Sequence, residues 1–376
     1  WSEAFSPLLS FSYIYLYFAY HKIELIQPFA FSDLKKLTMM NLQNNNLIFI
    51  DNNTFSGLVS LEELDLMYNF IETFGSKAFV DLDKLKLINL AYNRIKFISR
   101  PILNYLKSLK DFTMGYNSIK KINDFMFFCN NLTNIIDFSD NELENFKKFI
   151  FVGLENSLES LFLGKNKIKN IKKYYFDGLV KLNELILGNN KISSIEEGSF
   201  KTLRSLGKLD LRFNFLYHLQ PYLFDSNRML RIIIIDGNII SKIHKNSFQN
   251  LTLLTDLSLK ENNLYELDEN LFSSLVNLRK LSLNNNYIYS ISTNCFTTNT
   301  RLQEIYLSNN LMKSLNGSLR NLRLLSRIDL SNLKLKEFSS YDFTNLSSIT
   351  HLDLSNNFQI KLLDNPDILR NLLSLK

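Results

Sequence analysis

The chain has 376 residues, a hydrophobic fraction of 45%, a charged fraction of 21% and a formal net charge of +6 at pH 7. These fractions are ordinary for a globular protein, and no stretch reaches the roughly 18 apolar residues that a membrane-spanning helix needs. Composition therefore excludes a membrane span within these residues and leaves a globular chain with a small excess of basic residues.

The sequence consists of near copies of one segment. Residues 65–79 read DLMYNFIETFGSKAF, and residues 186–200 read ILGNNKISSIEEGSF. One asparagine marks each copy, and nearly every step between these asparagines is 24 residues. The series is Asn45, Asn69, Asn93, Asn117, Asn141, Asn166, Asn190, Asn214, Asn238, Asn262, Asn286, Asn310 and Asn357. Its one gap falls on Leu333, which follows Asn310 by 23 residues.

In chain order, residues 1–34 form a degenerate first repeat, residues 35–357 form regular repeats, and residues 358–376 form the last repeat and the start of another. We therefore predict a single array of about fifteen repeats over residues 1–376. Length alone suggests two or three domains, but an array needs no domain boundary because each repeat contacts only its neighbours. Polar caps are missing, so we interpret the chain as an uncapped fragment.

Residues 8–20, LLSFSYIYLYFAY, allow two interpretations. Their length fits the core of a signal peptide, but no basic segment precedes them and no small-residue cleavage site follows. They also fit the repeat register, with Tyr13, Leu16 and Phe18 in apolar slots. We favour the repeat and keep the signal peptide as the alternative.

Each regular repeat predicts one short strand. Side chains alternate along a strand, so Leu185 and Leu187 enter the core while Ile186 between them points outward. One repeat cannot bury its apolar side alone, but stacked repeats form a parallel sheet over a continuous core. A phenylalanine near the end of most repeats is expected to form a stacked spine on the opposite side of that core.

The repeated asparagine is predicted to be structural. The chain turns after each strand and leaves backbone N–H and C=O groups inside, where they must be hydrogen-bonded. An asparagine side chain offers both an acceptor and donors, so one per repeat can bridge adjacent turns as a ladder. In the repeat of residues 186–200, Asn190 is the ladder residue and Asn189 is expected to face solvent.

These motifs resemble those of extracellular leucine-rich-repeat proteins of the 24-residue type, and the resemblance covers essentially the whole chain. It implies an α/β leucine-rich-repeat solenoid, or horseshoe. The parallel β-sheet would form the concave face, and irregular, short 3-10 or helical turns would form the convex face. It also places the chain on the extracellular face of the plasma membrane, with any membrane anchor outside this fragment.

No pattern of a catalytic, metal or cofactor site occurs: there is no Gly-rich phosphate loop, H-E-x-x-H, C-x-x-C or G-x-S-x-G. The four histidines lie in distant repeats, so we expect no enzyme activity, no cofactor and no metal. Cys129 and Cys295 lie seven repeats apart, too far for a mutual disulfide. Both are expected near the phenylalanine spine, as small hydrophobic residues.

Function is expected on the outward positions of the concave sheet. Most are polar, but the middle of the array carries apolar residues: Phe162, Ile186, Phe213, Ile232 and Ile234. Contiguous exposed apolar surface commonly marks a partner site, so we predict that these five residues bind a partner. The alternative is that they stiffen the strands, or face another copy of the chain or a carbohydrate.

Two further features are candidates. Tyr68, Tyr92 and Tyr116 each precede a ladder asparagine, and tyrosine suits recognition because it offers rigid area with a polar tip. The alternative is that this slot only borders the asparagine turn.

Residues 164–176, GKNKIKNIKKYYF, add five lysines to Lys120, Lys121, Lys147 and Lys148. This basic flank could attract an acidic partner, a glycan or a nucleic acid.

The plainer explanation of the lysines is a coding bias towards Lys, Asn, Ile, Phe and Tyr, so nucleic acid is not an expected partner.

The resemblance predicts the protein-binding ectodomain of a cell-surface adhesion protein, similar to chaoptin-like proteins, which binds a protein ligand or another copy of itself. The alternative is the ligand-sensing ectodomain of a Toll-like signalling receptor. Sequons at Asn52, Asn131, Asn250, Asn316 and Asn345 permit a glycoprotein but do not argue for one.

Overall fold

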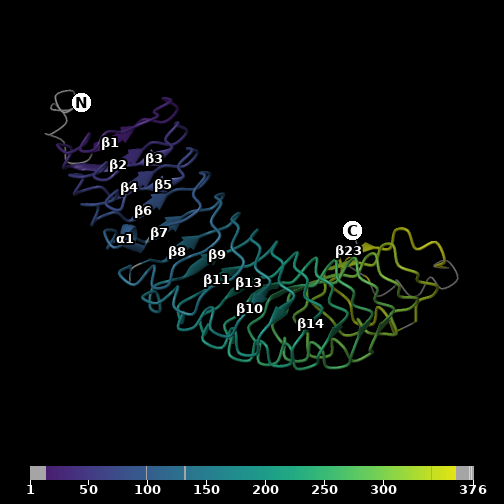
Figure 1. Cartoon of the computed structure of the whole chain (residues 1–376). Helices are drawn as coiled ribbons and strands as arrows, with labels where there is room; N and C mark the ends of the chain where they lie inside the picture. Colours follow the sequence, from purple (N-terminus) through teal and green to yellow (C-terminus); the bar gives the residue numbers. More distant parts are fainter. Residues whose placement is uncertain are drawn as a thin grey trace. The chain divides into compact units, whose positions relative to one another are not determined.

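The computed structural model describes residues 14–98, 100–130, 133–339, 341–360, 372 and 374. The chain divides into two compact units, residues 1–190 and residues 191–376. Tyr13, Asn131 and Leu375 lie outside the described residues. Figure 1 shows the repeated turns of the chain, each contributing a short strand to a sheet. The single array predicted from the sequence stays a prediction.

The first unit contains a parallel sheet in which each strand comes from the next repeat (Figure 1). Its strands, in order, are β1 (Ile14–Tyr17), β2 (Leu37–Asn41), β4 (Glu63–Asp65), β6 (Leu87–Asn89), β7 (Asp111–Thr113), β8 (Ile135–Asp137), β9 (Ser160–Phe162) and β11 (Glu184–Ile186). The register advances by one repeat at each pair, so that Leu64 lies beside Ile88 and Ile88 beside Phe112. Equivalent residues of successive repeats are therefore direct neighbours.

The second unit repeats this arrangement. Its sheet runs through β13 (Lys208–Asp210), β15 (Ile232–Ile234), β17 (Asp256–Ser258), β19 (Lys280–Ser282), β21 (Glu304–Tyr306), β22 (Arg327–Asp329) and β23 (His351–Asp353). The 23-residue step leaves the sheet intact, because Ile305 of β21 still pairs with Ile328 of β22. The shortening is therefore taken up outside the strands.

Shorter strands lie after the main strands. They are β3 (Phe49–Ile50), β5 (Thr73–Phe74), β10 (Asn170–Ile171), β12 (Ser194–Ile195), β14 (His218–Leu219), β16 (Lys242–Ile243), β18 (Glu266–Leu267) and β20 (Ser290–Ile291). The one helix among the described residues is α1 (Arg100–Leu103), and that part of the chain holds no helix long and apolar enough to cross a membrane. The predicted fold class, a solenoid of parallel strands with irregular turns opposite the sheet, is confirmed.

Alternation along each strand builds the core. Leu185 and Leu187 are fully buried, while Ile186 between them is half-buried on the outer face of the sheet. The spine phenylalanines are buried and stack from repeat to repeat, with Phe224 and Phe248 6.5 Å apart between ring centroids and Phe248 and Phe272 6.2 Å apart. Aromatic area of this size dominates core energetics, so the spine stabilises the side opposite the sheet.

The expectation that both cysteines belong to the core was wrong for one of them. Cys295 is buried, whereas Cys129 is exposed. Cys295 directly precedes the spine residue Phe296, a position that points inward, as does Ala78 before Phe79. Cys129 follows its spine phenylalanine by two residues and lies on the outside of the turn.

Each ladder asparagine bridges two repeats. The Asn190 Oδ1 accepts a hydrogen bond from the Ile168 N–H at 3.1 Å, and its Nδ2 donates to the carbonyls of Leu163 and Leu187 at 2.9 Å each. All thirteen asparagines of the series accept a backbone N–H of the preceding repeat and donate to the carbonyl three residues before themselves. Asn189 faces solvent.

A second set of buried asparagines was not anticipated from the sequence. Asn130, Asn227 and Asn299 occupy the slot three residues after the spine phenylalanine, where most repeats have leucine. The Asn227 Nδ2 donates to the carbonyls of Phe200 and Leu203, at 2.9 and 2.8 Å. The only sequence signal is the fixed spacing from the phenylalanine, which is easily overlooked among so many asparagines.

Replacing the ladder residue tests this account. Asn190→Ala should lower the free energy of unfolding by about 1 to 3 kcal/mol, because the Ile168 N–H loses its partner inside the protein. Chemical denaturation followed by circular dichroism measures the change. The control is Asn189→Gly in the same turn, where φ is 57° and glycine is unstrained; its effect should stay below about 0.5 kcal/mol. Equal effects for both variants would contradict the ladder.

Candidate functional site

Many polar residues on the exposed face of the sheet have a structural task. The Asp65 Oδ1 accepts a hydrogen bond from the Met67 N–H at 2.9 Å, and the Asp137 Oδ1 accepts one from the Ser139 N–H at 2.7 Å. The same bond to the residue two positions later is made by Asn41, Asn89, Asp210, Asp329 and Asp353. The outward slot between the two strand leucines is therefore not freely variable, since a side-chain oxygen there holds the following turn.

Phe162 and Ile186 of the first unit occupy this slot without such an oxygen. They lie directly opposite each other on β9 and β11, and both are half-buried. Ile186 packs over Gly164, where a methyl group would lie 3.6 Å from the Ile186 Cγ2. The two side chains form a small apolar surface at a position where neighbouring strands place aspartate.

The other three residues of the predicted patch belong to the second unit. Ile232 and Ile234 project from β15 and are half-buried, while Phe213 is 44% exposed. The Phe213 ring lies against the backbone of Gly237, where a methyl group would meet ring carbons at 2.2 and 2.6 Å. The five predicted residues thus form one group of two residues and one group of three, each within its own unit.

A hollow of about 340 Å³ lies beside Ile234 on the sheet of the second unit. Its floor includes Ser258 and Ser282, whose small side chains occupy the outward slot of β17 and β19. Three ion pairs surround it: Arg212 with Asp210 at 2.7 Å, Lys260 with Asp236 at 3.8 Å, and Lys280 with Glu304 at 3.3 Å. Four of the five charged residues that line the hollow are therefore paired, and Asp256 is the one that takes part in no ion pair among the described residues.

Asp236 is the most buried acid beside this hollow, with 4% of its surface exposed. Burial raises the pKa of its carboxyl above the ordinary value of 3.8, and hydrogen bonds from Ser258 and Lys260 oppose this only in part. The charged form is therefore disfavoured by the fold.

The tyrosine row forms a continuous stack in the first unit. Ring centroids are 4.4 Å apart between Tyr68 and Tyr92 and 3.9 Å apart between Tyr92 and Tyr116. All three have positive φ angles, of 53°, 54° and 56°. Bulky residues rarely adopt this conformation, and the same slot holds asparagine or glycine in other repeats, as at Asn189 and Gly237. Strain held at a surface position is typical of functional sites.

The row ends at a charged pair. The Lys165 Nζ lies 3.2 Å from the Asp140 Oδ2, 3.4 Å from the Tyr116 hydroxyl and 5.3 Å from the centre of the Tyr116 ring. These contacts raise the pKa of Lys165, chiefly through Asp140. Tyr68 and Tyr116 keep 44% and 40% of their surface exposed, so the row presents aromatic edges and hydroxyls beside a cation.

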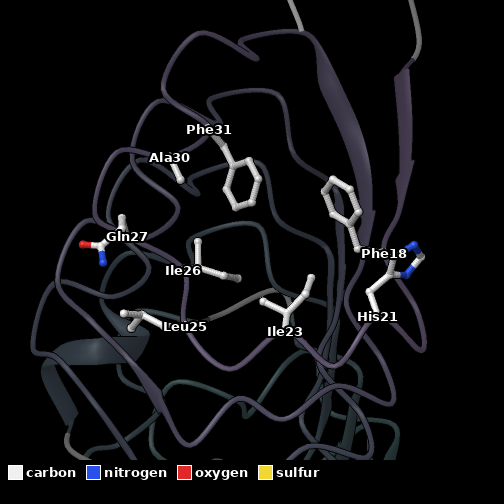
Figure 2. Close-up of a pocket in the computed structure, with 8 residues that line it drawn as sticks. All are labelled: Phe18, His21, Ile23, Leu25, Ile26, Gln27, Ala30 and Phe31. Atoms are coloured by element: carbon white, nitrogen blue, oxygen red, sulfur yellow. The ribbon is translucent and has the colours of Figure 1, made fainter. Parts of the chain in front are cut away.

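An apolar hollow of about 300 Å³ lies in the first repeat (Figure 2). Its lining is Phe18, His21, Ile23, Leu25, Ile26, Gln27, Ala30 and Phe31. Ile26 and Phe31 are core residues, equivalent to Ile50 and Phe55 of the next repeat. The His21 Nδ1 lies 2.6 Å from the Ala19 carbonyl oxygen. The hollow is an end of the stacked core within the described residues, not a group of catalytic side chains.

The profile of the leucine rich repeat family matches residues 15–71, 60–119, 156–216, 228–288 and 276–335. The chain belongs to the leucine rich repeat family. No curated protein matches the sequence significantly. The family fold is typical of protein-interaction modules rather than of enzymes, and the described residues contain no group of three or more His, Cys, Asp and Glu side chains placed to hold a metal ion.

Several solved structures share the fold. A leucine-rich-repeat protein of Leptospira interrogans has a TM-score of 0.80 and 22% identity, over 100% of this chain and 97% of that one. Drosophila Toll, solved in complex with Spatzle, has a TM-score of 0.83 and 20% identity over 97% of this chain, which spans 50% of its length. FLRT2, solved in an octameric complex with Latrophilin 3 and Unc5D, has a TM-score of 0.60 and 25% identity, over 69% of this chain and 78% of that one.

The tyrosine stack is tested by titration. Tyr92 has a raised pKa, mainly because its side chain is hydrogen-bonded to Tyr116. The free energy of unfolding should therefore fall as the pH rises above 10.0, the ordinary pKa of tyrosine. Tyr116→Phe should lower the pKa of Tyr92, as measured by NMR of isotope-labelled tyrosine rings. The control, Tyr289→Phe in a stacked pair of the second unit, should leave it unchanged; equal pKa values in all three proteins would refute the hydrogen bond between Tyr92 and Tyr116.

The buried acid predicts a pH dependence. The folded pKa of Asp236 lies above 3.8. The free energy of unfolding should therefore fall as the pH rises from 3.8 through that raised pKa. Asp236→Asn resembles the protonated form and should be more stable than the wild type at pH 7, with the difference shrinking as the pH falls through the raised pKa towards 3.8. Thermal unfolding of both proteins across this range measures it. A variant that is less stable at neutral pH would show that the ion pair with Lys260 outweighs burial.

Proposed function

We propose that this leucine-rich-repeat chain is the protein-binding ectodomain of a cell-surface adhesion protein. It would bind a protein ligand or another copy of itself through the exposed face of its sheet. The sequence resemblance to chaoptin-like proteins supports the extracellular location and the adhesive role.

One observation supports binding at this face above others. Seven strands use an Asp or Asn oxygen to hold the turn. Phe162, Ile186 and Ile234 occupy the same slot with apolar side chains and forgo that hydrogen bond. Half-exposed apolar groups among paired charges match the composition of protein interfaces, in which an apolar centre is enclosed by a polar rim. FLRT2, at 25% identity, was solved in complex with other proteins, which agrees with this role.

A Toll-type sensing ectodomain is the second candidate. It is favoured by the likeness to Drosophila Toll over 97% of this chain, a likeness of fold. The two functions differ in the partner: adhesion of the self-binding kind needs only other copies, whereas a receptor needs a separate ligand.

The first experiment displays the protein on otherwise non-adherent cells and measures their aggregation. Ile234→Lys should abolish aggregation, because it places an ammonium group in the apolar centre of the sheet face, which is unfavourable to bury. The matched control is Ile239→Lys. Ile239 lies in the same repeat and is 46% exposed, but it follows the ladder residue Asn238 and lies off the strand.

The outcomes separate the candidates. Loss of aggregation with Ile234→Lys alone, with unchanged circular dichroism, supports adhesion through the sheet face. Failure of wild-type cells to aggregate favours the receptor with a separate ligand. An altered circular dichroism spectrum of Ile234→Lys would instead make Ile234 a structural residue.

A further inference from the structure

A second surface of the first unit is dominated by positive charge. Seven lysines follow the ladder asparagines of three successive repeats by three to seven residues: Lys120, Lys121, Lys147, Lys148, Lys169, Lys172 and Lys173. We call this surface the lysine edge. Lys147 and Lys172 hold equivalent positions in adjacent repeats, so the stacking that builds the sheet also brings these side chains together.

The lysine edge contains a hollow of about 530 Å³. Lys147, Lys148, Lys169 and Lys172 line it together with the amide side chains of Asn145 and Asn170. Glu144 also lines the hollow, and the Asp124 Oδ2 lies 3.3 Å from the Lys147 Nζ. Within the described residues, Lys148 and Lys172 have no carboxylate at ion-pair distance.

The aromatic residues around the hollow contact one another or a lysine. Phe146 and Tyr175 are buried and in edge contact at 5.2 Å, and Tyr174 meets the edge of Tyr175 at 5.5 Å. Phe149 stacks on Phe125 at 5.2 Å, and the Lys148 Nζ lies 5.4 Å from its ring centre. Single-stranded nucleic acids are held largely by stacking on exposed ring faces. Of the aromatic residues that line the hollow, Phe146 and Tyr175 are buried and Tyr174 is half-exposed, so the hollow offers little of that contact.

The hollow also lacks what a protein partner or a membrane would use. Protein interfaces are centred on apolar or aromatic anchors, and here Phe146 and Tyr175 are already buried in the core. Peripheral membrane binding commonly adds inserted apolar side chains to basic residues, and no aliphatic residue of the described part of the chain lines this hollow. What remains is a set of ammonium and amide groups, which donate hydrogen bonds to anionic and hydroxylated ligands.

We propose that the lysine edge binds a sulfated polysaccharide. Sulfate groups would pair with Lys148 and Lys172, and sugar hydroxyls would bond to the amide of Asn145. Lysine suits this ligand because its ammonium group is a compact charge on a flexible side chain, which can pair with a sulfate in many orientations. The surface is separate from the sheet face, since its residues follow the ladder asparagine whereas the strand residues precede it.

The test is calorimetric titration of the full chain with a heparin-derived oligosaccharide of defined length. Lys148→Glu/Lys172→Glu should weaken binding by about tenfold or more at about 0.15 M salt. The matched control, Lys334→Glu/Lys336→Glu, makes the same change of charge at exposed lysines of the second unit, and its affinity should stay within about twofold. Circular dichroism checks the fold of each variant.

A milder variant protects the test against misfolding. Lys148→Gln/Lys172→Gln should reduce the slope of log affinity against log salt by about two, one for each ammonium–sulfate pair that the variant cannot form. No wild-type binding, equal binding of the desulfated oligosaccharide, or equal weakening by both charge-reversal variants would overturn the proposal. Single-stranded RNA of equal charge that binds as tightly as heparin would also overturn it, because the site would then not select sulfated sugars.

Discussion

The structure depends on one constraint: the backbone groups that each turn leaves inside must find hydrogen-bond partners in a dry core. One asparagine per repeat meets it, because its oxygen accepts from the preceding repeat and its nitrogen donates within its own turn. This link sets the spacing, so that equivalent residues such as Leu257 and Leu281 become neighbours. Where Leu333 takes the asparagine slot, the disturbance stays local, because Asn357 accepts from the Leu333 N–H and β22 still pairs with β23.

The asparagine ladder also constrains two surface positions in each repeat, the residue before the asparagine and the outward slot of the strand. The residue before each ladder asparagine has a positive φ, which asparagine and glycine adopt readily. The outward slot between the strand leucines often carries an oxygen that holds the turn, as in Asp65. A residue that is unfavourable at one of these two positions is therefore a stronger indication of a functional site than a residue at an unconstrained position. By that measure Tyr92 and Ile186 stand out, the first through its backbone conformation and the second through the hydrogen bond it cannot make.

Periodicity made the ladder and the spine predictable from the sequence, because both repeat at fixed spacing and their burial follows from stacking alone. The exposure of Cys129 and the burial of Asn130 were not predictable in this way. They lie in the turns opposite the sheet, where repeats differ and a shift of one residue exchanges core for solvent. The hollow that contains Lys148 and Lys172 was equally out of reach, because a count of lysines does not reveal which of them share a recess or lack carboxylate partners.

The two proposed surfaces rest on different forces, and this follows from where their charges lie. Beside the hollow on the sheet of the second unit most charges are paired, as in Arg212 with Asp210 at 2.7 Å, so binding there would depend mainly on the apolar area beside Ile234. In the hollow of the lysine edge, Lys148 and Lys172 have no carboxylate at ion-pair distance among the described residues, so binding there would depend on their positive charge. Salt screens exposed charges strongly at about 0.15 M but does not weaken the burial of apolar area. Ionic strength therefore distinguishes the two surfaces: polysaccharide held at the lysine edge would be released at a salt concentration at which a protein partner on the sheet face stays bound.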